Sequence, residues 1–218
     1  MCFAVRGEKH GVELCQTHVI MNVMQNFISA VGEFALEIIQ TVVVVLSIFL
    51  IVYLFLVQPH QVNGLSMFPT YDNGDYLLTD KVTYRTRSPK RGEVVVFAAP
   101  DAAQCPKGTG CDFIKRVLGL PGETVEVKDN GIWINGKKVP EPYIPPENVT
   151  KPGAYTQNRT VTLSADEYFV SGDNRPHSSD SRSWGPIKRE EIVGKVFFRY
   201  WPIKSIGIIQ PTTYPKPI

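Results

Sequence analysis

The sequence predicts a mostly β protein in which an antiparallel β domain follows one N-terminal helix. Two observations indicate this fold class. Residues 38–57 form a long apolar segment without a charge, and the chain after it consists of short apolar runs separated by turn residues, including most of the 17 glycines and all 17 prolines. Frequent Gly and Pro turns between short strands are typical of all-β domains. The 218 residues suffice for one sizeable domain plus the helix.

The segment Ile38–Val57 is expected to be a retained transmembrane helix. A helix of this length spans about 30 Å, the thickness of the hydrocarbon core of a bilayer. A secretory signal peptide is an alternative, but its apolar region usually has only about 7–15 residues. No small-residue cleavage motif follows, because the next residues are Gln58, Pro59 and His60. A buried core helix is a further alternative, but the segment lacks the polar face of an amphipathic helix.

Charge near this segment predicts its orientation. Arg6 and Lys9 precede it, and residues 58–77 contain neither Lys nor Arg. The positive-inside rule therefore favours a cytoplasmic N-terminus, which leaves the rest of the chain outside the cytoplasm. The expected organisation is a cytoplasmic leader (1–37), a transmembrane helix (38–57), an extracytoplasmic β domain (58–203) and a C-terminal tail (204–218).

Short apolar runs predict the strands of the β domain. Asp129, Asn130 and Gly131 form a hairpin turn between two of them. Residues 58–64 are expected to be a linker, and 140–160 a long proline-rich loop. The predicted strands are 76–79, 93–98, 112–120, 124–128, 132–134, 167–170 and 195–201.

Composition limits the partners and cofactors. The formal net charge is only +2 and no block of Lys or Arg stands out, which argues against a nucleic-acid partner. Cys105 and Cys111 flank a short loop; a disulfide and two free thiols are both compatible with this spacing. No second Cys or His pair lies nearby, so no metal site and no cofactor are expected.

Lys115 and Arg116 are adjacent cations in an apolar strand, where successive side chains point to opposite faces. At least one of them is therefore expected to face the interior or a cleft. A buried lysine has a lowered pKa and can act as a general base near neutral pH. The strand by itself favours the alternative, an edge strand from which both cations reach water.

Ser66 and residues 172–185 have structural interpretations of their own. A serine in a Gly/Pro loop is usually a turn residue, and Ser66 is not part of a G-x-S-x-G nucleophile elbow. The segment 172–185 is rich in Asp, Asn, Ser and Arg, which is also typical of a hydrogen-bonded loop.

Taken together and in this order, four segments resemble the conserved boxes of bacterial type I signal peptidases (peptidase family S26). The resemblance extends from about residue 38 to residue 202. The segments are Ser66–Thr70 (SMFPT), Arg91–Phe97 (RGEVVVF), Lys115–Glu123 (KRVLGLPGE) and Gly172–Arg182 (GDNRPHSSDSR).

The resemblance implies a membrane-bound serine endopeptidase that removes signal peptides from exported proteins. Members cut after small residues, as in Ala-x-Ala, and need no cofactor. The implied partners are the signal peptides of exported preproteins and the lipid bilayer. The implied fold is a mostly β protease domain that contains a small coiled barrel.

The resemblance also assigns roles to residues. Ser66 would attack the scissile carbonyl, neutral Lys115 would accept its proton, and the backbone N–H of Ser66 would bind the oxyanion. Gly64 stands where some members carry a hydroxyl residue that helps to bind the oxyanion, so the second donor is unidentified. The other matching residues are Ser178, which holds the lysine amine; Asp180 and Arg182, which brace the site through ionic contacts that involve Arg116; and Met67 and Pro69, which bind substrate.

Three alternatives stay open at this point. A self-cleaving repressor-type Ser–Lys protease would lack the membrane helix. A Ser–His protease would use His60 or His177, the histidines that follow the apolar segment. An inactive membrane-anchored module would bind signal peptides without turnover.

Overall fold

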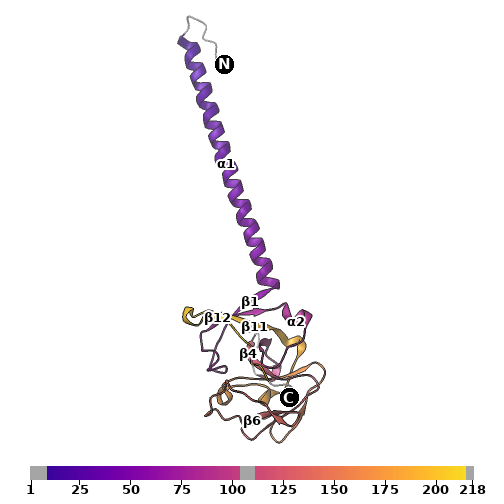
Figure 1. Cartoon of the computed structure of the whole chain (residues 1–218). Coiled ribbons are helices and arrows are strands. Elements are labelled where there is room, and N and C mark those ends of the chain that lie inside the picture. The colour runs from indigo at the N-terminus through magenta and orange to yellow at the C-terminus, as the bar shows by residue number, and fades with distance from the viewer. Residues whose placement is uncertain (1–8, 104–110, 215–218) are drawn as a thin grey trace. The chain divides into compact units, whose positions relative to one another are not determined.

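The computed structural model describes residues 9–103 and 111–214, with the side chains of the long helix described from Met21 onward (Figure 1). The chain divides into two compact units, Met1–Val52 and Tyr53–Ile218. The question whether Cys105 and Cys111 form a disulfide involves Cys105, which lies outside the described ranges.

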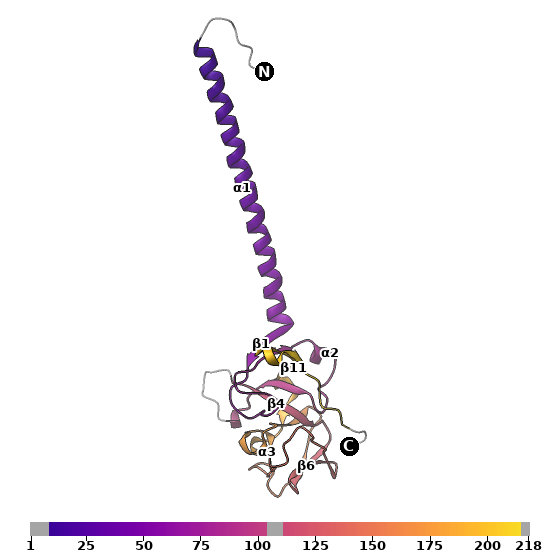
Figure 2. The same ribbon diagram turned by 60° about the vertical axis from the view of Figure 1, so that its left-hand side comes forward.

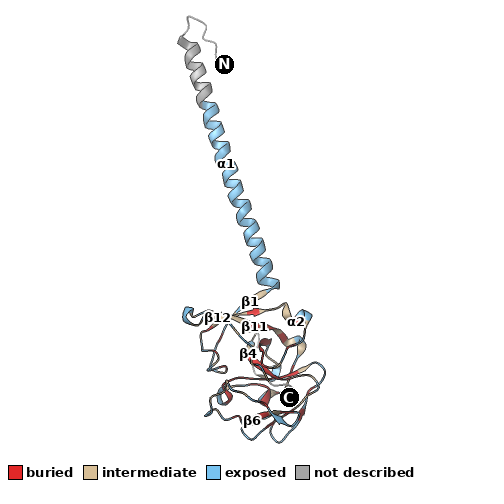
Figure 3. Cartoon of the chain, viewed as in Figure 1, coloured by how far each residue is buried: buried red, intermediate tan, exposed pale blue. Residues whose placement is uncertain are grey.

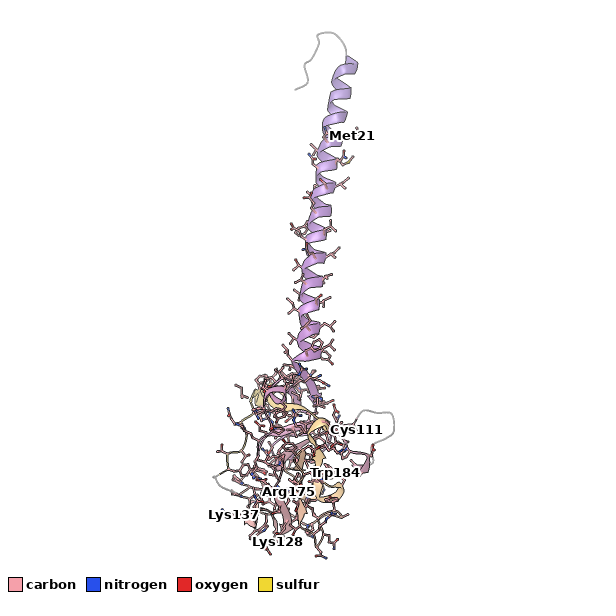
Figure 4. All side chains as sticks on the ribbon, turned by 90° about the vertical axis from the view of Figure 1, so that its right-hand side faces the viewer. Met21, Cys111, Lys128, Lys137, Arg175 and Trp184 are labelled. Carbon is pink, nitrogen blue, oxygen red and sulfur yellow. The ribbon has the colours of Figure 1, made fainter. Side chains whose placement is uncertain are left out.

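Helix α1 (Lys9–Phe55) makes up the first unit and extends a few residues into the second. Its side chains are exposed from Met21 to Phe55 (Figure 3) and project on all sides of the ribbon (Figure 4). Within the described chain, Met21–Phe55 is the one helix long and apolar enough to cross a membrane. Compared with the predicted segment 38–57, α1 starts much earlier and ends two residues sooner. It ends there because Val57 already pairs with a strand.

The second unit is built from two antiparallel sheets, which confirms the predicted mostly β fold (Figure 1). The larger sheet has the order β1-β2-β11-β3-β4-β9-β10, with β12 paired to β11, and the smaller sheet has the order β7-β6-β5-β8. The strands of the larger sheet are β1 (Val57–Gln61), β2 (Tyr76–Asp80), β3 (Val94–Ala98), β4 (Asp112–Gly119), β9 (Glu167–Ser171), β10 (Ile187–Lys188), β11 (Ile192–Trp201) and β12 (Gly207–Ile208). Those of the smaller sheet are β5 (Thr124–Lys128), β6 (Gly131–Ile134), β7 (Lys137–Lys138) and β8 (Val161–Thr162). Short helices complete the unit: α2 (Thr83–Thr86), α3 (Ser181–Trp184) and the 3-10 turns Asp101–Ala103, Arg175–His177, Arg189–Glu191 and Ile203–Ser205.

The larger sheet is strongly curved. Strands β1 and β4 are separated by three strands in the ladder, so in a flat sheet they would lie about 19 Å apart. Instead, His60 Nε2 on β1 lies 3.3 Å from Asp112 Oδ2 on β4. The five strands β1-β2-β11-β3-β4 therefore curl towards a closed arrangement.

The predicted linker 58–64 is partly a strand. Residues Val57–Gln61 form β1, which pairs with β2 along its whole length. The sequence VQPHQ has no alternation of apolar and polar residues, and Pro59 argues against a strand. Proline is tolerated here because β1 is an edge strand, where a missing N–H leaves no ladder bond unmade.

Two left-handed turns shape the smaller sheet, and the first of them is the hairpin turn predicted at Asp129–Gly131. Asp129 and Asn130 have φ angles of 48° and 53°, and they join β5 to β6. Asn135 and Gly136, at 50° and 77°, join β6 to β7. Positive φ at both central residues defines the tight hairpin turn for which Asn and Gly are favoured.

Gly119 is closely packed in the apolar core beneath the smaller sheet. A side-chain carbon at this position would lie 2.7 Å from Leu163 Cδ1, 2.8 Å from Phe169 Cβ and 3.0 Å from Val125 Cγ2. All three neighbours are buried, so none can move into solvent to make room.

We predict that Gly119→Ala lowers the stability of the domain by about 1–3 kcal/mol, because overpacking a filled core forces side chains and backbone to shift. Gly207→Ala is the matched control, since nothing lies within 4 Å of the added carbon. The denaturant midpoints of both variants and wild type, monitored by tryptophan fluorescence, test this. Equal midpoints for the two variants would contradict the packing described here.

Candidate active site

The loop that carries Ser66 is held in shape by its own backbone. Val62 N donates to Asp75 O (2.8 Å) and Gly74 N donates to Val62 O (2.8 Å), which closes the loop at its base. Gly64 has a φ of 105°, a conformation that side chains rarely adopt, and its N–H donates to Asn73 Oδ1 (2.8 Å). Ser66 is thus displayed from a loop with a fixed path.

Lys115 lies next to this serine. Its Nζ donates to Ser66 Oγ at 2.9 Å and to Ile114 O at 3.0 Å. Strand β4 is central, between β3 and β9, and Lys115 and Arg116 are only 4% and 3% exposed. The expectation of an edge strand with two solvent-facing cations is therefore wrong, because both faces of β4 are covered.

Burial lowers the pKa of Lys115 from its ordinary value to about 8, because removal from water disfavours the ammonium form. The carboxylates of Asp180 and Asp173 act in the opposite direction but are weaker influences. No carboxylate bonds directly to Nζ within the described residues, so burial dominates. A substantial fraction of Lys115 is therefore neutral near physiological pH.

Arg116 points away from Lys115 and forms a buried ion pair with Asp173. Its Nε donates to Asp173 Oδ1 (2.9 Å) and its Nη2 to Asp173 Oδ2 (2.6 Å). Asp173 also accepts from Thr70 Oγ1 (2.5 Å), which lies at the end of the serine loop. Two bonds from Asn174 reach the same loop, from its N–H to Ser66 O and from Nδ2 to Leu65 O, both 3.0 Å. This pair therefore connects the lysine strand to the serine loop.

Asp180 and Arg182 form a second buried cluster. Asp180 caps α3 and accepts from Ser171 Oγ (2.9 Å), Gly172 N (3.0 Å) and Arg182 Nε (2.8 Å). Burial alone would raise the pKa of Asp180, but the hydrogen bonds and charge of Arg182 hold it below its ordinary value. The expected involvement of Arg116 in this cluster is not observed, because the oxygens of Asp180 are already taken and Asp173 occupies the guanidinium.

Ser178 lies close to Ser66 across Gly172. A side-chain carbon on Gly172 would collide with the Ser66 carbonyl and with the Ser178 hydroxyl, so glycine is required for this approach. Ser178 Oγ is near enough to Asp180 to lower the pKa of that carboxyl, yet it is buried and lies outside hydrogen-bonding geometry with any described group. It is consequently available to a neighbouring donor.

A cavity of about 220 Å³ opens onto the two residues Ser66 and Lys115. Met67 lines this cavity, whereas Pro69 is exposed and does not. His177 is exposed, and His60 contacts Thr79 and Asp112 rather than Ser66. The complete lining is Gln61, Val62, Asn63, Ser66, Met67, Asp112, Phe113, Ile114, Lys115 and Ser179.

Several residues of the site escaped the sequence analysis. Asp173 and Asn174 stand in the GDNR segment, whose density of polar side chains is the signal that could have identified them. Arg175, from the same segment, lies inside the domain (labelled in Figure 4), where it bonds Glu141 and Thr150 Oγ1. Nothing in the local sequence distinguishes Thr150 or Glu141 within their long loop.

Comparison with known proteins places this site in a family. The family described as "Signal peptidase, peptidase S26" matches residues 35–201. A probable signal peptidase I-2 from Synechocystis sp. is 37% identical over 174 residues, covering 80% of this chain and 77% of the relative. Signal peptidase IB from Staphylococcus aureus (strain COL) is 37% identical over 182 residues, covering 78% and 91%. A crystal structure of a signal peptidase I from Enterococcus faecalis V583 is 36% identical, covers 50% of this chain and 97% of that one, and has a TM-score of 0.40. The chain therefore belongs to the signal peptidase family, peptidase S26, and is a serine endopeptidase of that family.

Proposed function

We propose that this protein is a membrane-bound signal peptidase I that cuts preproteins after small residues, with Ser66 as nucleophile and Lys115 as general base. The observation that carries the proposal is the 2.9 Å hydrogen bond between Lys115 Nζ and Ser66 Oγ, made by a lysine that is 4% exposed. A nucleophile and a base within hydrogen-bonding distance form the core of a catalytic dyad.

The chemistry follows from this contact. Neutral Lys115 accepts the hydroxyl proton as Ser66 Oγ attacks the carbonyl carbon of the scissile peptide bond. The Ser66 N–H stabilises the oxyanion, and the resulting ammonium of Lys115 donates its proton to the leaving amine nitrogen. Water then attacks the acyl-enzyme and gives a proton to Lys115. Lys115 passes this proton to Ser66 Oγ as the ester bond breaks, so the signal peptide leaves with a new carboxyl group and the neutral dyad is restored.

Ser178, Asp180, Arg182 and Arg116 support the dyad in this proposal. The Ser178 hydroxyl is buried without a hydrogen-bond partner among the described groups, so it can accept from the lysine amine during turnover. Asp180 and Arg182 hold the backbone at Gly172, which separates Ser178 from Ser66. Arg116 acts on the opposite side, through Asp173.

The size of the cavity supports small residues next to the cut. Its volume of about 220 Å³ is below the 300–1,000 Å³ typical of sites for drug-sized ligands. An extended signal peptide presents alternate side chains to the same face, so the first and third residues before the cut enter the site together. Ala-x-Ala fits this arrangement, with Met67 in the wall of the cavity and Pro69 bordering the loop.

The apolar helix supports a membrane anchor. We place residues 1–37 on the cytoplasmic side and the membrane span in the part of the apolar helix Met21–Phe55 that begins at Ile38. The catalytic domain then lies outside the cytoplasm. An anchored enzyme stays beside the bilayer that still holds the signal peptide. Protease protection of a tag at either end of the chain tests this orientation.

We predict that Lys115→Arg lowers kcat about 10³-fold, because a guanidinium keeps its proton and cannot serve as a base. Lys195→Arg, at a cation paired with Glu93, is the matched control and should retain activity. The assay is cleavage of a preprotein by the detergent-solubilised enzyme. Loss of activity in His177→Ala with retention in Lys115→Arg would instead favour a Ser–His mechanism.

The pH dependence follows from the lowered pKa of Lys115. Below about pH 8 the lysine is protonated and cannot accept the serine proton, so kcat/KM should rise with pH and reach half its maximum near pH 8. The rise should have the slope of a single deprotonation. A half-maximum near pH 10 would mean that the lysine is not desolvated during catalysis.

Substrate specificity gives a third prediction. Replacing either Ala of an Ala-x-Ala site by Phe should lower kcat/KM about 100-fold, because both side chains and the backbone between them share a cavity of about 220 Å³ that a bulky ring would crowd. Replacing the middle residue by Phe should change kcat/KM little, since its side chain points away. Mass spectrometry of the products locates the cut, and equal cleavage of all three peptides would refute the proposed specificity.

A further inference from the structure

The segment after β12 crosses the flank of the domain as an extended strap. In Figure 2 the yellow C-terminal segment runs along the side of the domain from the level of β11 towards that of β6. Ile209 N donates to Phe197 O (2.8 Å), and the Ile209 side chain packs on the apolar cluster that contains Met67. Tyr214 packs on the cluster beneath the smaller sheet. The strap, residues 209–214, is thus attached at both ends, and it lies beyond the residues matched by the family description.

The strap passes directly over Gly92. A side-chain carbon on Gly92 would collide with the Thr212 carbonyl and lie 2.7 Å from Tyr214 Cε2. The φ of Gly92 is 87°, which also disfavours any residue with a side chain. The backbones of the strap and of the turn before β3 therefore meet without intervening side-chain atoms.

At this crossing the strap contacts Arg116. Arg116 Nη1 donates to Thr212 Oγ1 (3.2 Å) and to Gly92 O (2.9 Å). The guanidinium carbon lies 4.2 Å from the centre of the Tyr143 ring, and the hydroxyl of Tyr143 is 3.3 Å from that of Tyr214. A buried guanidinium is stable only where its N–H groups find acceptors, and the strap provides one of them on the side opposite Asp173.

We propose that Thr212 and Tyr214 are positioning residues for the dyad and act through Arg116. The route is short: Thr212 and Tyr214 fix the guanidinium, the guanidinium fixes Asp173, and Asp173 with Asn174 fixes the loop that carries Ser66. Arg116 directly follows Lys115 on β4. By holding Arg116, the strap therefore fixes the position of the serine loop relative to the strand that carries Lys115. This inference rests on the proposed function, since it assigns these residues to the Ser–Lys reaction.

Thr212→Val tests the proposal with little change in shape. Removing the hydroxyl should lower kcat about tenfold, the typical effect of losing one hydrogen bond to a charged group, while KM stays within about twofold. Thr212→Ser should restore kcat, because it returns the acceptor. Thr213→Val is the matched control: its side chain is exposed, and kcat should equal that of wild type. Equal kcat in Thr212→Val and wild type, or equal losses in Thr212→Val and Thr213→Val, would overturn the proposal.

Hydrogen exchange gives a readout independent of cleavage. Loosening Asp173 should speed the exchange of amides in the serine loop, where Tyr71 N donates to Met67 O, and at Asn174, whose N–H donates to Ser66 O. We expect at least a threefold increase in Thr212→Val and in Tyr214→Phe, and none in Thr213→Val. Unchanged exchange in both strap variants would overturn the route through Asp173, even if kcat fell. If the strap variants exchanged faster but the wild-type enzyme cut no preprotein, the role of the strap would be supported and the proposed function refuted.

Discussion

The buried ion pair between Arg116 and Asp173 is the interaction on which the candidate site depends. Both residues are almost completely removed from water, at 3% and 0% exposure, so each would be costly to bury alone. Asp173 also accepts a hydrogen bond from Thr70, and Arg116 donates to Gly92 and Thr212. These three residues come from separate parts of the chain. Because a buried charge tolerates little displacement, these segments are held in one arrangement, and that arrangement brings Ser66 to Lys115.

Lys115 and Arg116 are neighbours on β4, but their surroundings shift their pKa values in opposite directions. Lys115 has no carboxylate bonded to its amine among the described groups, so burial lowers its pKa and favours the neutral amine that the proposed mechanism needs. Arg116 is buried to a similar degree, but the hydrogen bonds and charge of Asp173 raise its pKa, and it remains a cation. The strand places the two side chains on opposite faces, so Lys115 faces Ser66 while Arg116 faces Asp173.

Close packing against the backbone explains three glycines in the domain. Gly172 lets both Ser178 and the Ser66 carbonyl approach its backbone, Gly92 lets the C-terminal strap reach Arg116, and Gly119 gives room to Phe169 on the next strand. Each contact joins segments far apart in the sequence. The site therefore combines Lys115 on the central strand β4 with loops whose positions depend on close packing.

The sequence by itself determined the local features: the long apolar helix, most strands of the sheets and the hairpin turn at Asp129–Gly131. Its motifs also singled out Ser66 and Lys115, which the structure brings within hydrogen-bonding distance. These follow from periodicity, turn chemistry and short segments, all of which are readable over a few residues. Only the tertiary structure decided that β4 is central, that β1 is a strand despite Pro59, and that Asp173 rather than Asp180 pairs with Arg116. It also made the C-terminal segment part of the domain. The physical reason is the same in each case: burial, strand order and ion-pair choice depend on contacts between distant segments, and no local pattern encodes which distant segment will be the neighbour.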